Sequence, residues 1–354
     1  MIKKIMAVVT LLLPLLLSSC AGLNEDVDPI PLVNIEAEVS KEQEIIEPTI
    51  ALNDAPLFLG KPYKFVEEEA LSILVVEDDY MRQFSPFDYL AKFGLEEVPE
   101  SLDMLKPIYA KELIEWSEEE IQRITKVLES IEPRLEGMKI TMPDELWFIN
   151  ETGKIEGGAA YTRGNGIILP RSYIGSLDDR GLERLVLHEL FHVISRYNKE
   201  LRPEIYGVIH YEGCEQLVIE GELANRLIAN PDAPDLNYFI RGNYEGEEKS
   251  FIPILYSEYD VIASGETFFS HLHDDMLMVE IIEGKPVPSI DTQGNYRIVS
   301  KNKISNYYEL IGGNTSYTFH PEETMADNFV YMVLEKDDVV PDPWVLEALR
   351  KILW

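Results

Sequence analysis

The stretch from Ser176 to Arg196 constrains the fold of this chain more than any other part of its sequence. Its spacing predicts a single helix, which Ser176 or Asp178 can cap. The second half of this helix is apolar on nearly every face, at Leu185, Val186, Leu187, Leu190, Phe191, Val193 and Ile194. A helix that is apolar all round is buried in the centre of a domain. We therefore expect a globular domain built around this helix.

Three polar residues, His188, Glu189 and His192, interrupt the apolar run. Residues four apart lie on the same face of a helix, so both imidazoles can reach one metal ion at about 2.0–2.1 Å. Glu189 lies about 100° around the helix from His188 and about 60° from His192, close enough to reach a metal-bound water. The alternative is a helix with two structural histidines, but burying this trio without a metal leaves costly polar groups in the core.

A catalytic zinc site needs a third protein ligand and one open position. The pattern with a third His six residues after His192 is absent, because Asn198 stands there. Glu323 and Asp327 share one face of a later predicted helix, so Glu323 can bind the metal while Asp327 accepts the second N–H of a zinc-bound His, most simply His188. Acids in a first helical turn also complement the helix dipole. The remaining candidates for the third ligand are Glu220, Glu222, Glu322 or another His.

These motifs resemble those of the gluzincins, zinc peptidases with His-Glu-x-x-His on one helix and a Glu ligand on a later one. The later segment is similar to that of the anthrax lethal factor catalytic domain, matched here by Glu323, Ala326, Asp327 and Phe329. That group also has a Tyr shortly before the Glu, a place that Tyr317 takes. The resemblance implies an α+β, zincin-like domain with a small twisted sheet over the active-site helix.

The resemblance also implies a zinc metallopeptidase that acts on peptide or protein substrates. Zn²⁺ would polarise the scissile carbonyl and lower the pKa of a bound water. Glu189 would be the general base, and Tyr317, with His320 as the alternative, would stabilise the oxyanion. A strand near residues 159–169 would line the cleft, where a peptide can add as a further strand. Two other functions stay open: an inert zincin-like binding lipoprotein, and a zinc hydrolase of a non-peptide amide.

The catalytic domain is expected over residues 116–354, beginning with a helix that Ser117 and Glu120 can cap as a capping box. His192 and Glu323 are 131 residues apart (323 − 192), which implies a large insertion between the ligand helices. Within it, residues 215–229 have a helical pattern. Residues 61–115 are expected to form an N-terminal helical region of unclear role.

The first residues resemble a bacterial lipoprotein signal. Residues 1–19 combine two Lys with an apolar run too short to span a bilayer, and Leu17-Ser18-Ser19-Cys20 resembles a lipobox. Cys20 would then be lipidated, residues 20–60 would form an acidic tether, and the protein would be an exported lipoprotein held at a membrane by its lipid anchor. Only Cys214 would remain, so no internal disulfide is expected. The net charge of −33 makes nucleic acid a poor partner.

Overall fold

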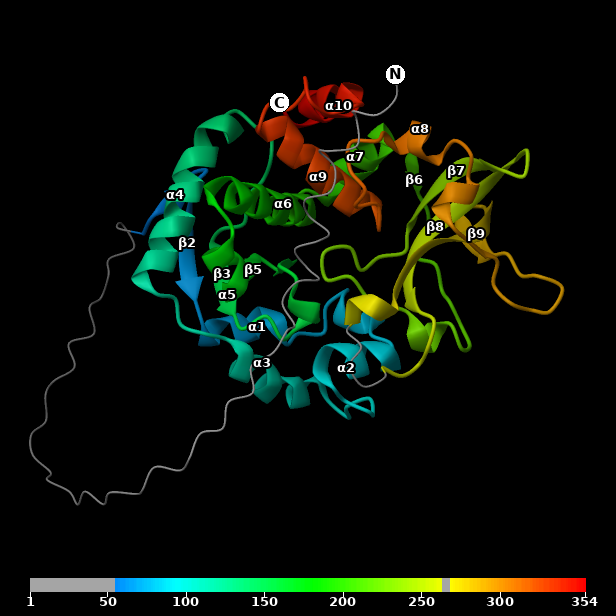
Figure 1. Cartoon of the computed structure of the whole chain (residues 1–354), viewed down its shortest axis with the longest axis horizontal. Helices are drawn as coiled ribbons and strands as arrows, with labels where there is room; N and C mark the ends of the chain where they lie inside the picture. Colours follow the sequence, from blue (N-terminus) through cyan, green and yellow to red (C-terminus); the bar gives the residue numbers. More distant parts are fainter. Residues whose placement is uncertain (1–54, 263–267) are drawn as a thin grey trace, which may run out of the picture. The chain divides into compact units, whose positions relative to one another are not determined.

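The computed structural model describes residues 55–262 and 268–354. The predicted signal peptide, Cys20 and most of the predicted tether lie outside the described residues. Helices and strands of the described part make a mixed α+β structure, as the sequence predicts (Figure 1). Within the same part, no helix combines the length and apolar character that crossing a membrane requires.

Five strands of the described residues form a first sheet, in the order β1-β2-β3-β5-β4. Strands β2, β3 and β5 are parallel, and β1 and β4 are antiparallel to their neighbours. Gly164, with φ of 54°, is the first residue of the tight turn between β4 and β5. Such a turn favours Gly at this position. The strands are β1 Leu57–Phe58, β2 Lys61–Val66, β3 Leu146–Glu151, β4 Tyr161–Arg163 and β5 Gly166–Pro170.

Alternate side chains of this sheet point to two separate cores. Phe148 and Ile167 contribute to the larger core, whereas their neighbours Ile149 and Ile168 contribute to a second one. This period of two follows from the pleat of a strand. Both cores are covered, so the central strands are apolar on both faces.

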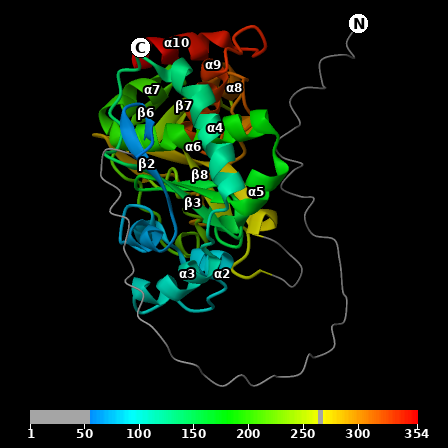
Figure 2. The same cartoon turned by 90° about the vertical axis from the view of Figure 1, so that its left-hand side faces the viewer.

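Helices α6 and α4 cover the face with the larger core, and α9 and α10 pack behind them. Helices α1 to α3 cover the opposite face, and both views show this arrangement (Figures 1 and 2). The predicted capping box of α4 is present, because Ser117 and Glu120 cap each other's backbone. The helices are α1 Leu71–Leu74, α2 Pro86–Phe93, α3 Lys106–Glu112, α4 Glu118–Leu135, α5 Arg171–Ser176, α6 Asp179–Tyr197, α7 Arg202–Val208, α8 Tyr307–Ile311, α9 Pro321–Val333 and α10 Pro343–Leu353.

The expected domain boundary at residue 116 does not separate two structural units. Strand β2 pairs with β3 from Tyr63 to Val66, and β1 lies inside the stretch assigned to the tether. Residues 67–113 bury their apolar side chains against the same sheet, for example Tyr109. The sequence could not show this, because the partner strand of β2 lies about eighty residues later.

The long segment between the two predicted ligand helices contains a second, antiparallel sheet. Its order is β10-β9-β8-β7-β6, and β11 pairs with β9. Residues 215–229 are not the expected helix: they run mostly without regular structure, and Leu217 and Leu223 pack on this sheet's own core. The strands are β6 Tyr211–Gly213, β7 Tyr238–Tyr244, β8 Glu247–Ser257, β9 Leu272–Ile282, β10 Lys285–Pro288 and β11 Ile298–Val299.

Candidate metal centre

Helices α6 and α9 pack against each other and bring three candidate ligands together. One carboxylate oxygen of Glu323 lies 3.2 Å from Nε2 of His188 and 3.4 Å from Nε2 of His192. Tetrahedral ligands at about 2.0–2.1 Å from one ion lie about 3.3 Å from each other, so this spacing suits an ion at their centre. His192 and Glu323 are each 1% exposed, which makes this a buried group that could hold a metal ion.

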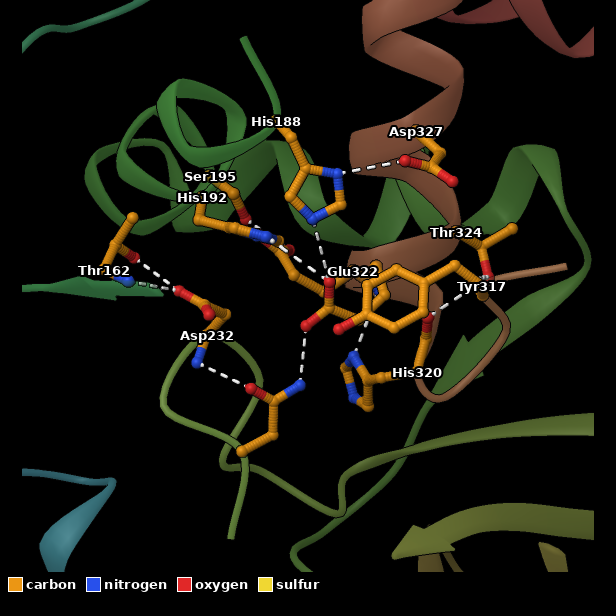
Figure 3. A network of polar contacts seen from close by, with 12 residues as sticks. Thr162, His188, His192, Ser195, Asp232, Tyr317, His320, Glu322, Thr324 and Asp327 are labelled. Carbon is orange, nitrogen blue, oxygen red and sulfur yellow. Dashed lines mark hydrogen bonds and ion pairs between the residues drawn. The ribbon is translucent and has the colours of Figure 1, made fainter. Parts of the chain in front are cut away.

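The other ring nitrogen of each histidine has an acidic partner. Nδ1 of His188 lies 3.1 Å from Asp327, and Nδ1 of His192 lies 3.0 Å from Glu322 (Figure 3). Each Nδ1–H donates to its carboxylate, so in the neutral ring each Nε2 carries a lone pair. Two lone pairs and the Glu323 carboxylate then converge on one point. Three acceptors so placed make a donor set that could hold a metal ion.

Glu322 takes a position in the site that the sequence did not reveal. The sequence left it as a candidate for the third ligand, but its carboxylate faces Nδ1 of His192 and not the centre of the site. Ser195 Oγ donates to it at 2.7 Å, and the Tyr206 hydroxyl donates to the same oxygen. Burial opposes its charge, but the hydrogen bond from His192 and the charge of Arg202 lower the pKa of Glu322. The only available sequence signal was an acid next to the predicted ligand.

Asp327 occupies the place that the sequence predicted for it. Besides His188, its carboxylate accepts a hydrogen bond from the Thr315 hydroxyl. Burial disfavours protonated His188, but hydrogen bonds to Asp327 and Glu323 outweigh this and raise the pKa of His188 to about 10. Without a metal, His188 therefore holds a second ring proton, and metal binding would release it.

Glu189 lies next to the three candidate ligands and outside their group. It is 3% exposed, and its Oε2 has no hydrogen-bond partner among the described residues. Burial and the nearby charge of Asp232 raise the pKa of Glu189 to about 8. A buried carboxyl with a free oxygen and a pKa near neutrality is suited to moving a proton.

Tyr317 and His320 lie on the far side of the site from Thr162 and Asp232 (Figure 3). The ring of Tyr317 lies 5.8 Å from that of His188, and burial together with the Glu323 carboxylate raises the pKa of its hydroxyl well above the ordinary value. His320 instead caps α9, because its Nδ1 accepts the backbone N–H of Glu322 at 3.1 Å. Tyr317 therefore carries the protonated hydroxyl that an oxyanion donor needs.

Asp232 is a second residue that sequence reasoning missed. Its carboxylate, one ring nitrogen of His192 and a Glu189 oxygen all lie within 4.8 Å of one another. Neighbouring Asn230 donates to Glu323 at 2.6 Å. Both residues come from the irregular segment that leads into the second sheet, and no spacing rule connects this segment with α6 or α9.

Glu220 and Glu222, which the sequence also allowed as the third ligand, are not brought to this site. Both are exposed and belong to neither group of candidate ligands among the described residues.

Cys214 is a free, half-buried thiol on the second sheet, and burial raises its pKa to about 11. A thiol with a raised pKa is a poor nucleophile at neutral pH.

Comparison with known proteins adds no assignment, since no family model, no curated protein and no solved structure matches this chain. The arrangement of the side chains is therefore the basis for inferring a function.

Proposed function

We propose that this protein is a zinc-dependent metallopeptidase of the gluzincin type. The observation that carries the proposal is the convergence of His188, His192 and Glu323 at 3.2 and 3.4 Å with Glu189 beside them. Three protein ligands with room for a fourth are typical of catalytic zinc sites, and structural sites usually have four. An inert scaffold would have no use for the additional acid Glu189 placed beside the ligands.

The donor set supports zinc as the metal. Two imidazole nitrogens and one carboxylate suit zinc, whereas magnesium and calcium prefer oxygen ligands alone. Both histidines are oriented through their second nitrogen by Asp327 and Glu322. Such partners fix the ring orientation and raise the basicity of the ligands.

Each nearby side chain has a role in peptide hydrolysis. Zinc, when bound, supplies Lewis-acid polarisation of the scissile carbonyl. Glu189 takes the proton of the attacking water and transfers it to the leaving amine. The Tyr317 hydroxyl donates a hydrogen bond to the developing oxyanion. The arrangement of α6 beneath a small sheet with the antiparallel edge strand β4 supports a zincin-like fold, in which an extended substrate adds along that edge.

We further propose that the enzyme works as an exported bacterial lipoprotein, anchored at the periplasmic or cell-surface face of a membrane. This rests on the lipobox-like sequence before Cys20 and on the acidic stretch that follows it. A lipidated terminus and a tether would keep the catalytic domain near the membrane surface. Its substrates would be peptides or proteins, as the resemblance to gluzincins implies, and the strongly negative chain makes nucleic acid a poor partner.

Metal analysis combined with a peptide-library assay tests this function. Purified protein should contain about one zinc per chain. It should cleave peptides in the mixed library, and Glu189→Gln should keep the zinc and lose the cleavage. Zinc without cleavage in both proteins would favour an inert binding lipoprotein or a hydrolase of another amide. Equal cleavage by both would assign the activity to another site.

A further inference from the structure

A loop that comprises residues 228–235, here called the covering loop, passes over the candidate metal centre. It leads out of the segment that was expected to be helical, and it precedes strand β7. Asp232 in this loop is 7% exposed, and Glu189, His192 and Glu323 beneath it are between 1% and 3% exposed. Glu189 and two of the three candidate ligands are therefore shielded from solvent in this structure.

Asp232 accepts hydrogen bonds from the edge strand of the first sheet. Its Oδ1 accepts the backbone N–H of Thr162 at 2.8 Å and the Thr162 hydroxyl at 2.7 Å (Figure 3). Thr162 lies in β4, the last strand of this sheet. A peptide that adds to a sheet does so through such backbone groups of the edge strand. The loop therefore uses a hydrogen-bond donor that an extended substrate would need.

The same loop also contacts the candidate ligands. Asn230 donates to the Oε1 of Glu323 at 2.6 Å, and its own side-chain oxygen accepts the backbone N–H of Asp232 at 3.0 Å. The Asp232 carboxylate lies in one group with Glu189 and His192, all within 4.8 Å. A carboxylate at this distance can approach an ion held by the candidate ligands, since carboxylate oxygen is a common zinc ligand.

Burial of Asp232 would be unfavourable if its only role were to bind Thr162. The carboxylate lies among the acids Glu189 and Glu323, and the positive charges that act on it are those of His192 and, from the side of Thr162, Arg196. Burying several like charges together is costly unless a cation compensates for them. A divalent ion held by the centre would supply that compensation and would attract Asp232.

We propose that Asp232 is an additional ligand of the metal and that the covering loop acts as a built-in competitor of substrate. The proposal rests on the proposed function, since it places the loop in that site's open position and on its edge strand. Substrate binding then requires the loop to leave both positions. An acidic peptide in extended conformation is chemically similar to the covering loop. Such a peptide would therefore compete best with the loop for the open metal position and the edge strand.

Cobalt substitution and a small chelating ligand test this without turnover. Co²⁺ would replace zinc in the wild type, in Asp232→Asn and in Asp235→Asn. The last is a matched control, because Asp235 lies on the same loop and outside both groups of candidate ligands. The visible spectrum of bound Co²⁺ reports its ligands, and acetohydroxamate binding reports whether the open position is accessible.

Asp232→Asn should change the cobalt spectrum and bind acetohydroxamate about 10-fold or more tightly than the other two proteins. The apparent affinity of a ligand is proportional to the fraction of molecules in which the loop is open, so a loop that is open about 10% of the time accounts for about that factor. Asn230→Ala, which loosens the loop and keeps Asp232, should shift the affinity in the same direction.

Identical spectra and affinities in wild type and Asp232→Asn would overturn this proposal and leave the proposed function standing. Loss of the metal from folded Asp232→Asn, checked by circular dichroism, would also overturn it, because Asp232 would then be an indispensable ligand and no competitor. If none of the proteins bound Co²⁺ or zinc, the proposed function itself would fall, and this inference with it.

Discussion

Replacing Glu322 by Gln removes the charge that orients His192 and keeps the shape of the side chain. In the structure this carboxylate accepts hydrogen bonds from His192 Nδ1 at 3.0 Å, from Ser195 Oγ at 2.7 Å and from the Tyr206 hydroxyl. A Gln amide oxygen has two lone pairs, and its NH₂ group can only donate. At least one of the three buried donors therefore loses its acceptor.

Two separate losses follow from this change. One unsatisfied buried donor costs about 1–3 kcal/mol of folding stability. Zinc affinity should fall about 10–100-fold, as is usual when a ligand loses the group that orients it. This factor corresponds to about 1.4–2.7 kcal/mol of binding free energy. Zinc should remain bound at high concentration, because His188, His192 and Glu323 are intact.

Competition with a chromophoric chelator measures the zinc affinity, and urea unfolding of the metal-free protein measures the stability. Asp327→Asn is the matched control, because Asp327 holds His188 in the same way and has one further donor, Thr315. It should lose a similar factor in zinc affinity and less folding stability. Wild-type zinc affinity in Glu322→Gln, together with a loss in Asp327→Asn, would refute the role given to Glu322.

Four further results are expected. Glu189→Gln should retain zinc and lose about 10²–10⁴-fold in kcat, measured on any peptide that the wild type cleaves; an unchanged kcat would exclude it as the base. Tyr317→Phe should lower kcat with little change in KM, because an oxyanion donor acts mainly in the transition state; a change confined to KM would contradict this. Burial and the charge of Glu156 raise the pKa of Glu151 from 4.5 to about 9, so between these pH values the folded state holds more protons than the unfolded chain and stability falls as pH rises. We therefore expect the free energy of unfolding of Glu151→Gln, relative to that of the wild type, to be higher at pH 8 than at pH 5 in urea unfolding. The same relative value at both pH values would show that Glu151 is ionised when folded. Cys20→Ala should not incorporate a fatty-acid label that the wild type takes up, and equal labelling would rule out lipidation there.

Several local features could be read directly from the sequence. The buried helix with His188 and His192 on one face, the capping box at Ser117 and the start of α9 at Pro321 all depend on residues within one or two turns of each other. Helical spacing also put Glu323 and Asp327 on one face. The structure brings both acids close to His188, at 3.2 and 3.1 Å, and their roles toward a metal remain predictions.

Errors arose where the structure depends on distant partners. Strand β2 was assigned to a separate region because its hydrogen-bond partner, β3, follows a long helical stretch. Residues 215–229 have a helical pattern, but Leu217 and Leu223 are buried in the core of the second sheet, and Gly221 takes a φ of 73°. Burial on that sheet outweighed the weak local preference for a helix.

The sequence by itself determined the chemistry that is available, because side chains three or four residues apart on a helix have fixed relative directions. Only the tertiary structure decided which atoms of the histidines each acid faces. Glu322 and Glu323 are neighbours in the chain, yet one faces Nδ1 of His192 and the other faces both Nε2 atoms. Asp232 reaches the site from a loop that follows Leu227 and Ala229, which pack in two different cores, and long-range packing leaves no period in the sequence.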